Sequence, residues 1–321
     1  MPSANPFDEI VWPPESSCKD RTGYSSEQLL SMFETYRLEL FDQHTPLTGN
    51  RTATEEHKRF YLVFVYIHMH PKVKDCIAVL RINGESKGNN RYYYDRYCRP
   101  IAWKLGEIMH EIHPEDRFDE YNHSPLVSER VTHILDSLPI RLCNSSMSLL
   151  QNLNVNPKYG GAVLKVTIGI TCTCIPVCFS INLGIPHDGG IAVKEEGYSW
   201  FERESWEWAM GDGPYESMER VAVKFRPRPI PGAAPLQYAP IPDDEMGDNG
   251  VFDFIRGRIE HLNAQFVAHE IFNGRKYRGS YQDLVAYVKI TIHALTLQIR
   301  EFETSRQREG FGPYPHHMPP F

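Results

Sequence analysis

Long apolar runs and leader-like features are absent from this chain of 321 residues. No stretch approaches the roughly eighteen consecutive apolar residues that a membrane-spanning helix requires. The opening residues Met1-Pro2-Ser3-Ala4-Asn5-Pro6 lack the basic and apolar regions of a signal peptide. We therefore expect a protein that neither crosses a membrane nor is exported, with the cytoplasm as its default location.

Cysteine is sparse, with 7 residues in the whole chain. Without an export signal these thiols are expected to stay reduced. Cys172, Cys174 and Cys178 lie in and beside apolar strand-like segments, and no matching pair of His or Cys stands at the spacing of a zinc finger. Buried thiols are therefore favoured over a zinc site.

An excess of basic residues is also missing, since the formal net charge is -7. Nucleic-acid binding depends on Lys and Arg that neutralise phosphates, so this balance argues against a surface that is basic throughout. The stretch from Arg51 to His113 differs, with 11 Lys and Arg against 7 Asp and Glu. A mildly basic module on an acidic body is consistent with DNA contact and equally with an ordinary helical domain.

The N-terminal part of the chain has helical patterns. Helices are predicted at Ser26–Leu40 and, joined by short Gly-containing segments, at His57–His68, Val73–Leu80 and Asn89–Ile112. The last three are compatible with a helix-turn-helix module, in which Arg91 and Arg96 would contact DNA among several tyrosines. A helical bundle with half-buried tyrosines fits the same pattern, and both readings remain open.

Strand patterns dominate the second part. They fall at Val131–Leu142, Ala162–Thr173, Val177–Leu183, Trp206–Met210 and Arg220–Phe225, with helices predicted at 191–203, Val251–Phe272 and Tyr281–Phe302. The Pro-rich residues 226–242 read as a loop. Strands followed by helices in this order predict an α/β fold with a mixed sheet and flanking helices.

Three acidic residues lie at positions where functional sites form in such a fold. Asp136 and Asp212 lie at the ends of strand-like segments, and Glu260 lies within the helical segment Val251–Phe272. Carboxylate oxygens are the ligands that Mg²⁺ and Mn²⁺ prefer, and two such ions suit phosphodiester chemistry. Taken singly, each acid also fits a turn, a cap or a solvated helix position. Taken as an ordered set, they favour a two-metal site.

Five short motifs follow one another along this part of the chain. They are Asp136-Ser137-Leu138-Pro139-Ile140-Arg141, Lys158–Val166, Gly184-Ile185-Pro186-His187-Asp188, Gly211-Asp212-Gly213-Pro214-Tyr215 with the basic Lys224–Pro231, and a helix with Arg256, Arg258, Glu260 and Phe266. In this order they resemble the DDE superfamily of Harbinger (PIF)-type transposases and their domesticated endonuclease-like relatives, over about residues 55–303. Ser137-Leu138 replaces the usual Gly-Thr of that family, and Gln265 stands where a Lys is common.

The resemblance implies a ribonuclease H-like catalytic domain preceded by a helix-turn-helix-like module. It implies divalent-metal-dependent hydrolysis of double-stranded DNA, with strand transfer as an extension and nuclear localisation. Asp136 would bridge two Mg²⁺ or Mn²⁺ ions, and Asp212 and Glu260 would each complete one. His187 and Asp188 would orient a ligand or a water, or simply form a Gly-rich turn. Possible phosphate contacts are Lys165, Arg256 and Arg258.

The predicted organisation is an extension at 1–54, a helical module at 55–125, the catalytic domain at 126–303 and a disordered tail at 304–321. A separate DNA-binding partner protein and a homodimer are further expectations from the resemblance. The alternative is a catalytically inactive relative that acts as a DNA- or protein-binding module. The departure at Ser137-Leu138 and the acidic charge motivate that alternative.

Overall fold

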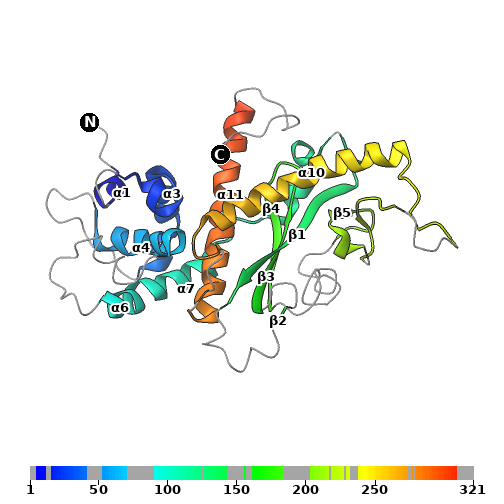
Figure 1. Cartoon of the computed structure of the whole chain (residues 1–321). Helices are drawn as coiled ribbons and strands as arrows, with labels where there is room; N and C mark the ends of the chain where they lie inside the picture. The colour runs from blue at the N-terminus through cyan, green and yellow to red at the C-terminus, as the bar shows by residue number, and fades with distance from the viewer. Residues whose placement is uncertain are drawn as a thin grey trace. The chain divides into compact units, whose positions relative to one another are not determined.

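The computed structural model of the chain describes residues 5–11, 16–41, 53–70, 90–124, 126–142, 155–156, 161–183, 203–216, 218–227, 229–231, 238–273, 277 and 279–308. The chain forms two compact units, each assembled from separate stretches of sequence. The first unit comprises Met1–Glu111, Arg141–Ser148 and Gln265–Gln298, and the second comprises Ile112–Ile140, Leu149–Ala264 and Ile299–Phe321. Helices and a sheet together make this a mixed α/β protein, as the sequence predicts (Figure 1).

The N-terminal stretch of the first unit is helical. Its elements are α1 (Pro6–Glu9), α2 (Cys18–Thr22), α3 (Ser26–Leu40), α4 (Glu55–Met69), α6 (Asn90–Tyr93), the π-helical turn η1 (Tyr94–Cys98) and α7 (Arg99–Ile108). Helix α3 has the predicted bounds because Ser25 and Gln28 form a reciprocal capping box at its start. The predicted helix Val73–Leu80 lies outside the described residues, so the helix-turn-helix module stays a prediction.

Aromatic side chains form much of the core of the first unit. Phe7, Phe33 and Phe60 are fully or almost fully buried and meet edge-on or tilted, with ring centroids 5.5 to 6.2 Å apart. His57 stacks on Phe33 at 4.1 Å, which places its ring in the same cluster. The apolar run predicted as helix His57–His68 is therefore a core helix, packed by its aromatic face.

The second unit is built on a six-stranded mixed sheet in the order β2-β3-β1-β5-β6, with β4 also paired to β3. The strands are β1 (Val131–Arg141), β2 (Val155–Asn156), β3 (Gly161–Ile170), β4 (Pro176–Leu183), β5 (Trp208–Gly211) and β6 (Val221–Ala222). β3 and β4 are antiparallel, whereas β5 runs parallel to β1 and β6 runs parallel to β5. The parallel pair β1–β5 brings together strands that are about seventy residues apart in sequence.

All five predicted strands are present, although four are shorter than predicted; β1 ends one residue early and β3 ends at Ile170 rather than Thr173. β5 begins at Trp208 rather than Trp206, because residues 204–207 form a turn closed by a hydrogen bond from Glu207 N to Glu204 O. β6 is reduced to Val221–Ala222. The core of this unit includes Leu135 of β1 and Cys178 of β4, together with Val177, Ala209, Tyr215, Met218 and Val221.

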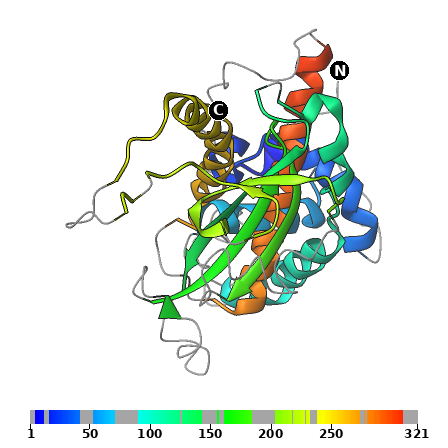
Figure 2. The same cartoon turned by 90° about the vertical axis from the view of Figure 1, so that its right-hand side faces the viewer.

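Two long helices close the described chain, α10 (Asp243–Ala268) and α11 (Tyr281–Arg308). In the second unit, α10 is hydrogen-bonded to Asp136 of β1 and to Cys174 in the turn between β3 and β4. Its ribbon passes across the strands in Figure 1 and is seen close to end-on in Figure 2. Residues 304–308, predicted as tail, continue α11 instead, and the rest of that tail lies outside the described residues. None of the described helices is long and apolar enough to cross a membrane.

The two units do not follow the linear boundaries that the sequence predicts at residues 54, 125 and 303. Helices α10 and α11 each contribute residues to both units, with the divisions after Ala264 and after Gln298. A helix of more than 25 residues is roughly 40 Å long, so it can serve two cores along its length. Boundaries between sequence patterns therefore differ here from boundaries between packed units.

Candidate functional site

Asp136 lies within β1 and is half-buried. Its Oδ1 accepts a hydrogen bond from Ser137 N at 2.8 Å, and its Oδ2 accepts one from Asn263 Nδ2 of α10 at 2.8 Å. Successive strand residues point to opposite faces, so Asp136 faces α10 while Leu135 on the other face joins the core cluster. The first predicted ligand is thus held by the helix that carries the third.

Asp212 follows β5 and is brought next to Asp136 by the sheet register. Leu135 pairs with Gly211, the last residue of β5, so Asp136 and Asp212 each directly follow a residue of this pair. Adjacent strands lie about 4.8 Å apart. Asp212 is exposed, and its Oδ1 accepts a hydrogen bond from Gly213 N at 2.7 Å as the cap of a short 3₁₀ turn.

Glu260 is on α10 but does not reach the two aspartates. Its carboxylate is exposed and pairs with Arg256 one turn earlier, at 2.6 Å between Arg256 Nη2 and Glu260 Oε1. In the part of the chain that the structure describes, no group of three His, Cys, Asp or Glu is placed to hold a metal ion. Asp136, Asp212 and Glu260 therefore do not form a ready three-carboxylate site.

Asn263 is the α10 residue that contacts Asp136, and sequence reasoning missed it. Residues three apart on a helix lie on the same face, so Asn263 is the neighbour of Glu260 one turn further on. That spacing is the sequence signal that would have identified it once Glu260 was a candidate. Because its Nδ2 donates to the carboxylate, its Oδ1 remains an oxygen of the kind that coordinates divalent cations.

Three hydroxyls join the segments that carry the two aspartates. Ser137 Oγ lies 2.8 Å from Tyr215 Oη and 2.8 Å from Thr167 Oγ1 of β3. Tyr215 belongs to the turn after Asp212, and its side chain packs against Gly211, where an added Cβ would meet the Tyr215 Cβ at 3.0 Å and its ring at 3.1 Å. The serine that departs from the family pattern thus connects β1 to the Gly-Asp-x-x-Tyr segment.

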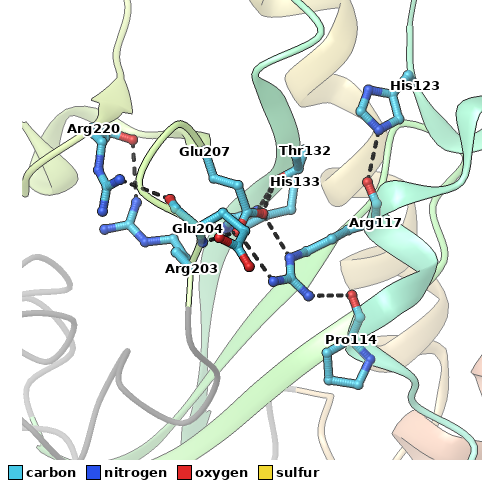
Figure 3. A network of polar contacts seen from close by, with 9 residues as sticks. All are labelled: Pro114, Arg117, His123, Thr132, His133, Arg203, Glu204, Glu207 and Arg220. Carbon is cyan, nitrogen blue, oxygen red and sulfur yellow. Dashed lines mark hydrogen bonds and ion pairs between the residues drawn. The ribbon is translucent and has the colours of Figure 1, made fainter.

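A buried ion pair fixes the start of the same two strands (Figure 3). Arg117 contacts both oxygens of the buried Glu207, with Nε to Oε1 at 2.7 Å and Nη2 to Oε2 at 3.2 Å. Thr132 of β1 donates to Glu207 Oε1 at 2.8 Å, and His133 Nδ1 lies 2.7 Å from the Thr132 hydroxyl. Since Glu207 directly precedes β5, the network links the beginnings of β1 and β5.

The protonation of this network follows from its surroundings. Burial acts to raise the pKa of Glu207, but hydrogen bonds from Arg117, the Glu204 amide and Thr132 outweigh it, so the pKa is lowered. Burial lowers the pKa of His133 to about 3. Glu207 is therefore ionised and His133 neutral at pH 7, and the ion pair is charged on both sides.

The residues predicted to contact DNA differ in accessibility. Lys165 and Arg258 are buried, at 5% and 3% exposed, so neither presents its charge to a ligand in this structure. Arg256 is engaged with Glu260. Arg96 is exposed and hydrogen-bonds the Tyr92 hydroxyl, with its guanidinium 5.5 Å from the Tyr97 ring centroid.

The remaining candidates lie outside the described residues or are cysteines expected to be buried thiols. The side chain of Arg91 lies outside the described residues, as do His187 and Asp188 entirely. Cys172 and Cys178 are buried free thiols, and burial raises the pKa of each. The prediction of buried thiols is confirmed at these two positions.

Comparisons with protein-family models, with curated protein sequences and with solved structures found no match to this chain.

Proposed function

We propose that this chain is a ribonuclease H-like, transposase-derived nuclease that hydrolyses DNA with the help of divalent metal ions. The observation that carries the proposal is the register of β1 and β5, in which Leu135 pairs with Gly211 and the next residue of each strand is an aspartate. This register supports the convergence of the two aspartates that the order of the motifs predicts. Two carboxylates on neighbouring parallel strands offer hard oxygen ligands at one place on the sheet.

The residues fit a divalent cation in part, because Asp136 and Asp212 follow paired residues of neighbouring strands, whereas Glu260 pairs with Arg256 and does not reach them. Glu260 would have to leave Arg256 to complete the set, and an exposed pair of this kind contributes only about 0.3–0.5 kcal/mol. When bound, Mg²⁺ or Mn²⁺ would activate the attacking water or 3′-hydroxyl and stabilise the leaving oxygen.

The protein's own groups supply position and charge. Asp136 and Asp212 would hold the cation, and the Ser137–Tyr215 hydrogen bond keeps the two aspartate segments together. The hydrolysis breaks one phosphodiester bond as water adds to phosphorus, leaving a hydroxyl on one strand end and a phosphate on the other. Transfer of a 3′ end to a second DNA is the same displacement with a 3′-hydroxyl in place of water.

Double-stranded DNA is the proposed substrate, and the acidic net charge of -7 is the main obstacle to binding it. Two sources of positive charge are proposed to offset this negative charge. One is the mildly basic stretch from Arg51 to His113, where Arg96 is exposed. The other is a separate DNA-binding partner protein. A homodimer is a further part of the proposal, with the nucleus as the place of action.

A non-catalytic DNA- or protein-binding relative is the second candidate. It is favoured by the pairing of Glu260 with Arg256 and by the burial of Lys165 and Arg258, which removes two proposed phosphate contacts. This candidate predicts salt-sensitive duplex binding without cleavage. Association that is insensitive to salt would indicate a protein partner instead.

The deciding experiment is Mn²⁺ titration calorimetry on the wild type and Asp136→Ala, followed by plasmid nicking with the wild type and Asp212→Asn. The nuclease proposal expects Mn²⁺ binding that Asp136→Ala abolishes, and nicking that Asp212→Asn abolishes while the far-UV circular dichroism is unchanged. Duplex DNA is included in a second titration, because substrate oxygens complete many magnesium sites. If Mn²⁺ binds in neither titration and the wild type does not nick plasmid DNA, the non-catalytic candidate is the one that remains.

A further inference from the structure

A cleft of about 910 Å³ lies in the second unit, away from the two aspartates, where β1 and β5 begin. Residues 127–130 lead into β1 and Trp206 leads into β5, and Trp208 N donates to Arg130 O at 2.7 Å to join the two walls. The cleft volume is at the upper end of the range for ligand sites, which leaves room for a short peptide segment.

Two aromatic rings line this cleft and are unusually open to solvent. Phe118 is 42% exposed and Trp206 is 43% exposed, and their ring centroids are 6.0 Å apart. Exposed aromatic residues held side by side are typical of binding surfaces, because they offer large contact area with few rotatable bonds.

The buried ion pair holds these rings in place. Phe118 directly follows Arg117, and Trp206 directly precedes Glu207, so the two-pronged contact between Arg117 and Glu207 fixes the backbone next to both rings. The Arg117 guanidinium also lies 4.0 Å from the centroid of the Phe118 ring. The aromatic pair is therefore rigid before any ligand arrives, which reduces the entropy lost on binding.

The charges around the rings select the ligand. Glu120 and Glu129 line the cleft together with one cation, Arg130, so the carboxylates outnumber the free guanidinium. Phosphate-bearing ligands are disfavoured by this balance, whereas a cation is attracted. The stacking of Arg117 on Phe118 shows that this environment already accepts a guanidinium against an aromatic face.

We propose that this cleft binds an arginine-containing segment of a partner protein, with a guanidinium packed on Trp206 and paired with Glu129 or Glu120. Arginine is preferred to lysine because its planar guanidinium stacks on aromatic rings and pairs with a carboxylate through two hydrogen bonds. The site is separate from the metal-binding proposal and does not depend on it.

The test is fluorescence anisotropy of a labelled peptide, Gly-Arg-Gly-Arg-Gly-Ser, titrated with the full chain at low salt. Binding is expected to weaken about tenfold in Trp206→Ala and in Glu129→Lys, the size expected for one desolvated cation–π contact or one charge pair. Trp206→Phe keeps an aromatic face and should retain most of the affinity. Tyr238→Ala is the matched control, since Tyr238 is an exposed aromatic residue that does not line the cleft.

Two competitors complete the design. A peptide with Glu in place of both Arg should not compete, and decathymidine should compete weakly. The proposal is overturned if the wild type does not bind the arginine peptide, if Trp206→Ala and Glu129→Lys bind it as tightly as the wild type, or if decathymidine binds more tightly in a Trp206-dependent way. Asp136→Ala should bind the peptide normally, which separates this result from the fate of the nuclease proposal.

Discussion

Asn263 on α10 donates a hydrogen bond from Nδ2 to Oδ2 of Asp136 on β1, over 2.8 Å. The first predicted metal ligand is thus held by an amide of the helix, while the predicted third ligand, Glu260, pairs with Arg256 one turn away. A cation that takes Asp136 as a ligand must share or displace this hydrogen bond. The helix and the strand are therefore coupled at the carboxylate on which the nuclease proposal depends.

Asn263→Asp is expected to strengthen Mn²⁺ binding about tenfold, because it places another carboxylate beside Asp136 and ligand charge sets cation affinity. In the metal-free protein the two like charges repel, so the melting temperature should fall at pH 7 and recover when Mn²⁺ is added. Calorimetry and thermal melts with and without Mn²⁺ measure both effects. Asn263→Ala is the control, and equal Mn²⁺ affinity in the two variants would show that residue 263 does not face the cation.

Glu207→Ala is expected to destabilise the protein by about 3–5 kcal/mol, because it leaves the buried Arg117 guanidinium without its partner. Urea unfolding followed by circular dichroism measures the loss. Glu219→Ala removes an exposed carboxylate from the same unit and should change the free energy of unfolding by no more than about 0.5 kcal/mol. Similar losses in both variants would mean that the Arg117–Glu207 pair contributes nothing specific.

The buried His133 is expected to make stability fall as the pH falls below about 6.5, the value at which an imidazole in the unfolded chain takes a proton. In the folded chain burial lowers the pKa of His133 to about 3, so the native state stays neutral across that interval. The unfolded state then binds more protons, and stability decreases by about 1.4 kcal/mol per pH unit for this group.

The measurement is the free energy of unfolding at several pH values between 5 and 6.5, for the wild type and His133→Gln. This interval lies above the pKa of about 4.3 at which carboxylates such as Glu207 are half protonated in the unfolded chain. The variant should have the shallower dependence by about 1.4 kcal/mol per pH unit. His269, whose pKa burial also lowers to about 3, contributes the same slope to both proteins. Parallel curves would refute the assignment.

The hydroxyl cluster should show coupling between Ser137 and Tyr215. Tyr215→Phe is expected to cost about 1 kcal/mol, because it removes one buried hydrogen bond with little change of shape. Ser137→Ala should cost more, since both Tyr215 and Thr167 lose a partner. A double-mutant cycle by urea unfolding should give a coupling of about 1 kcal/mol between the two positions. Additive effects would show that their hydrogen bond is not formed in solution.

The sequence by itself determined the elements and the positions of the two aspartates along them. The helix Ser26–Leu40 and the strands around Val131 and Gly161 follow from local periodicity and capping, which act between residues close in the chain. The order of Asp136 and Asp212 along the chain is also read from the sequence, but Asp136 lies within β1 rather than at a strand end as predicted. In the structure the residues that precede them, Leu135 and Gly211, are paired on the parallel strands β1 and β5.

Tertiary structure decided what each of these side chains contacts. From sequence alone, charged residues such as Lys165 and Arg258 are expected on the surface. Both are nevertheless buried by elements distant in the chain. Glu260 was the expected partner of Asp136, but the three-residue offset along α10 gives that contact to Asn263. The pairing of Arg117 with Glu207 joins residues ninety positions apart. Whether a side chain is buried, and which residue it pairs with, depends on residues that are distant in the sequence. No local sequence pattern encodes either property.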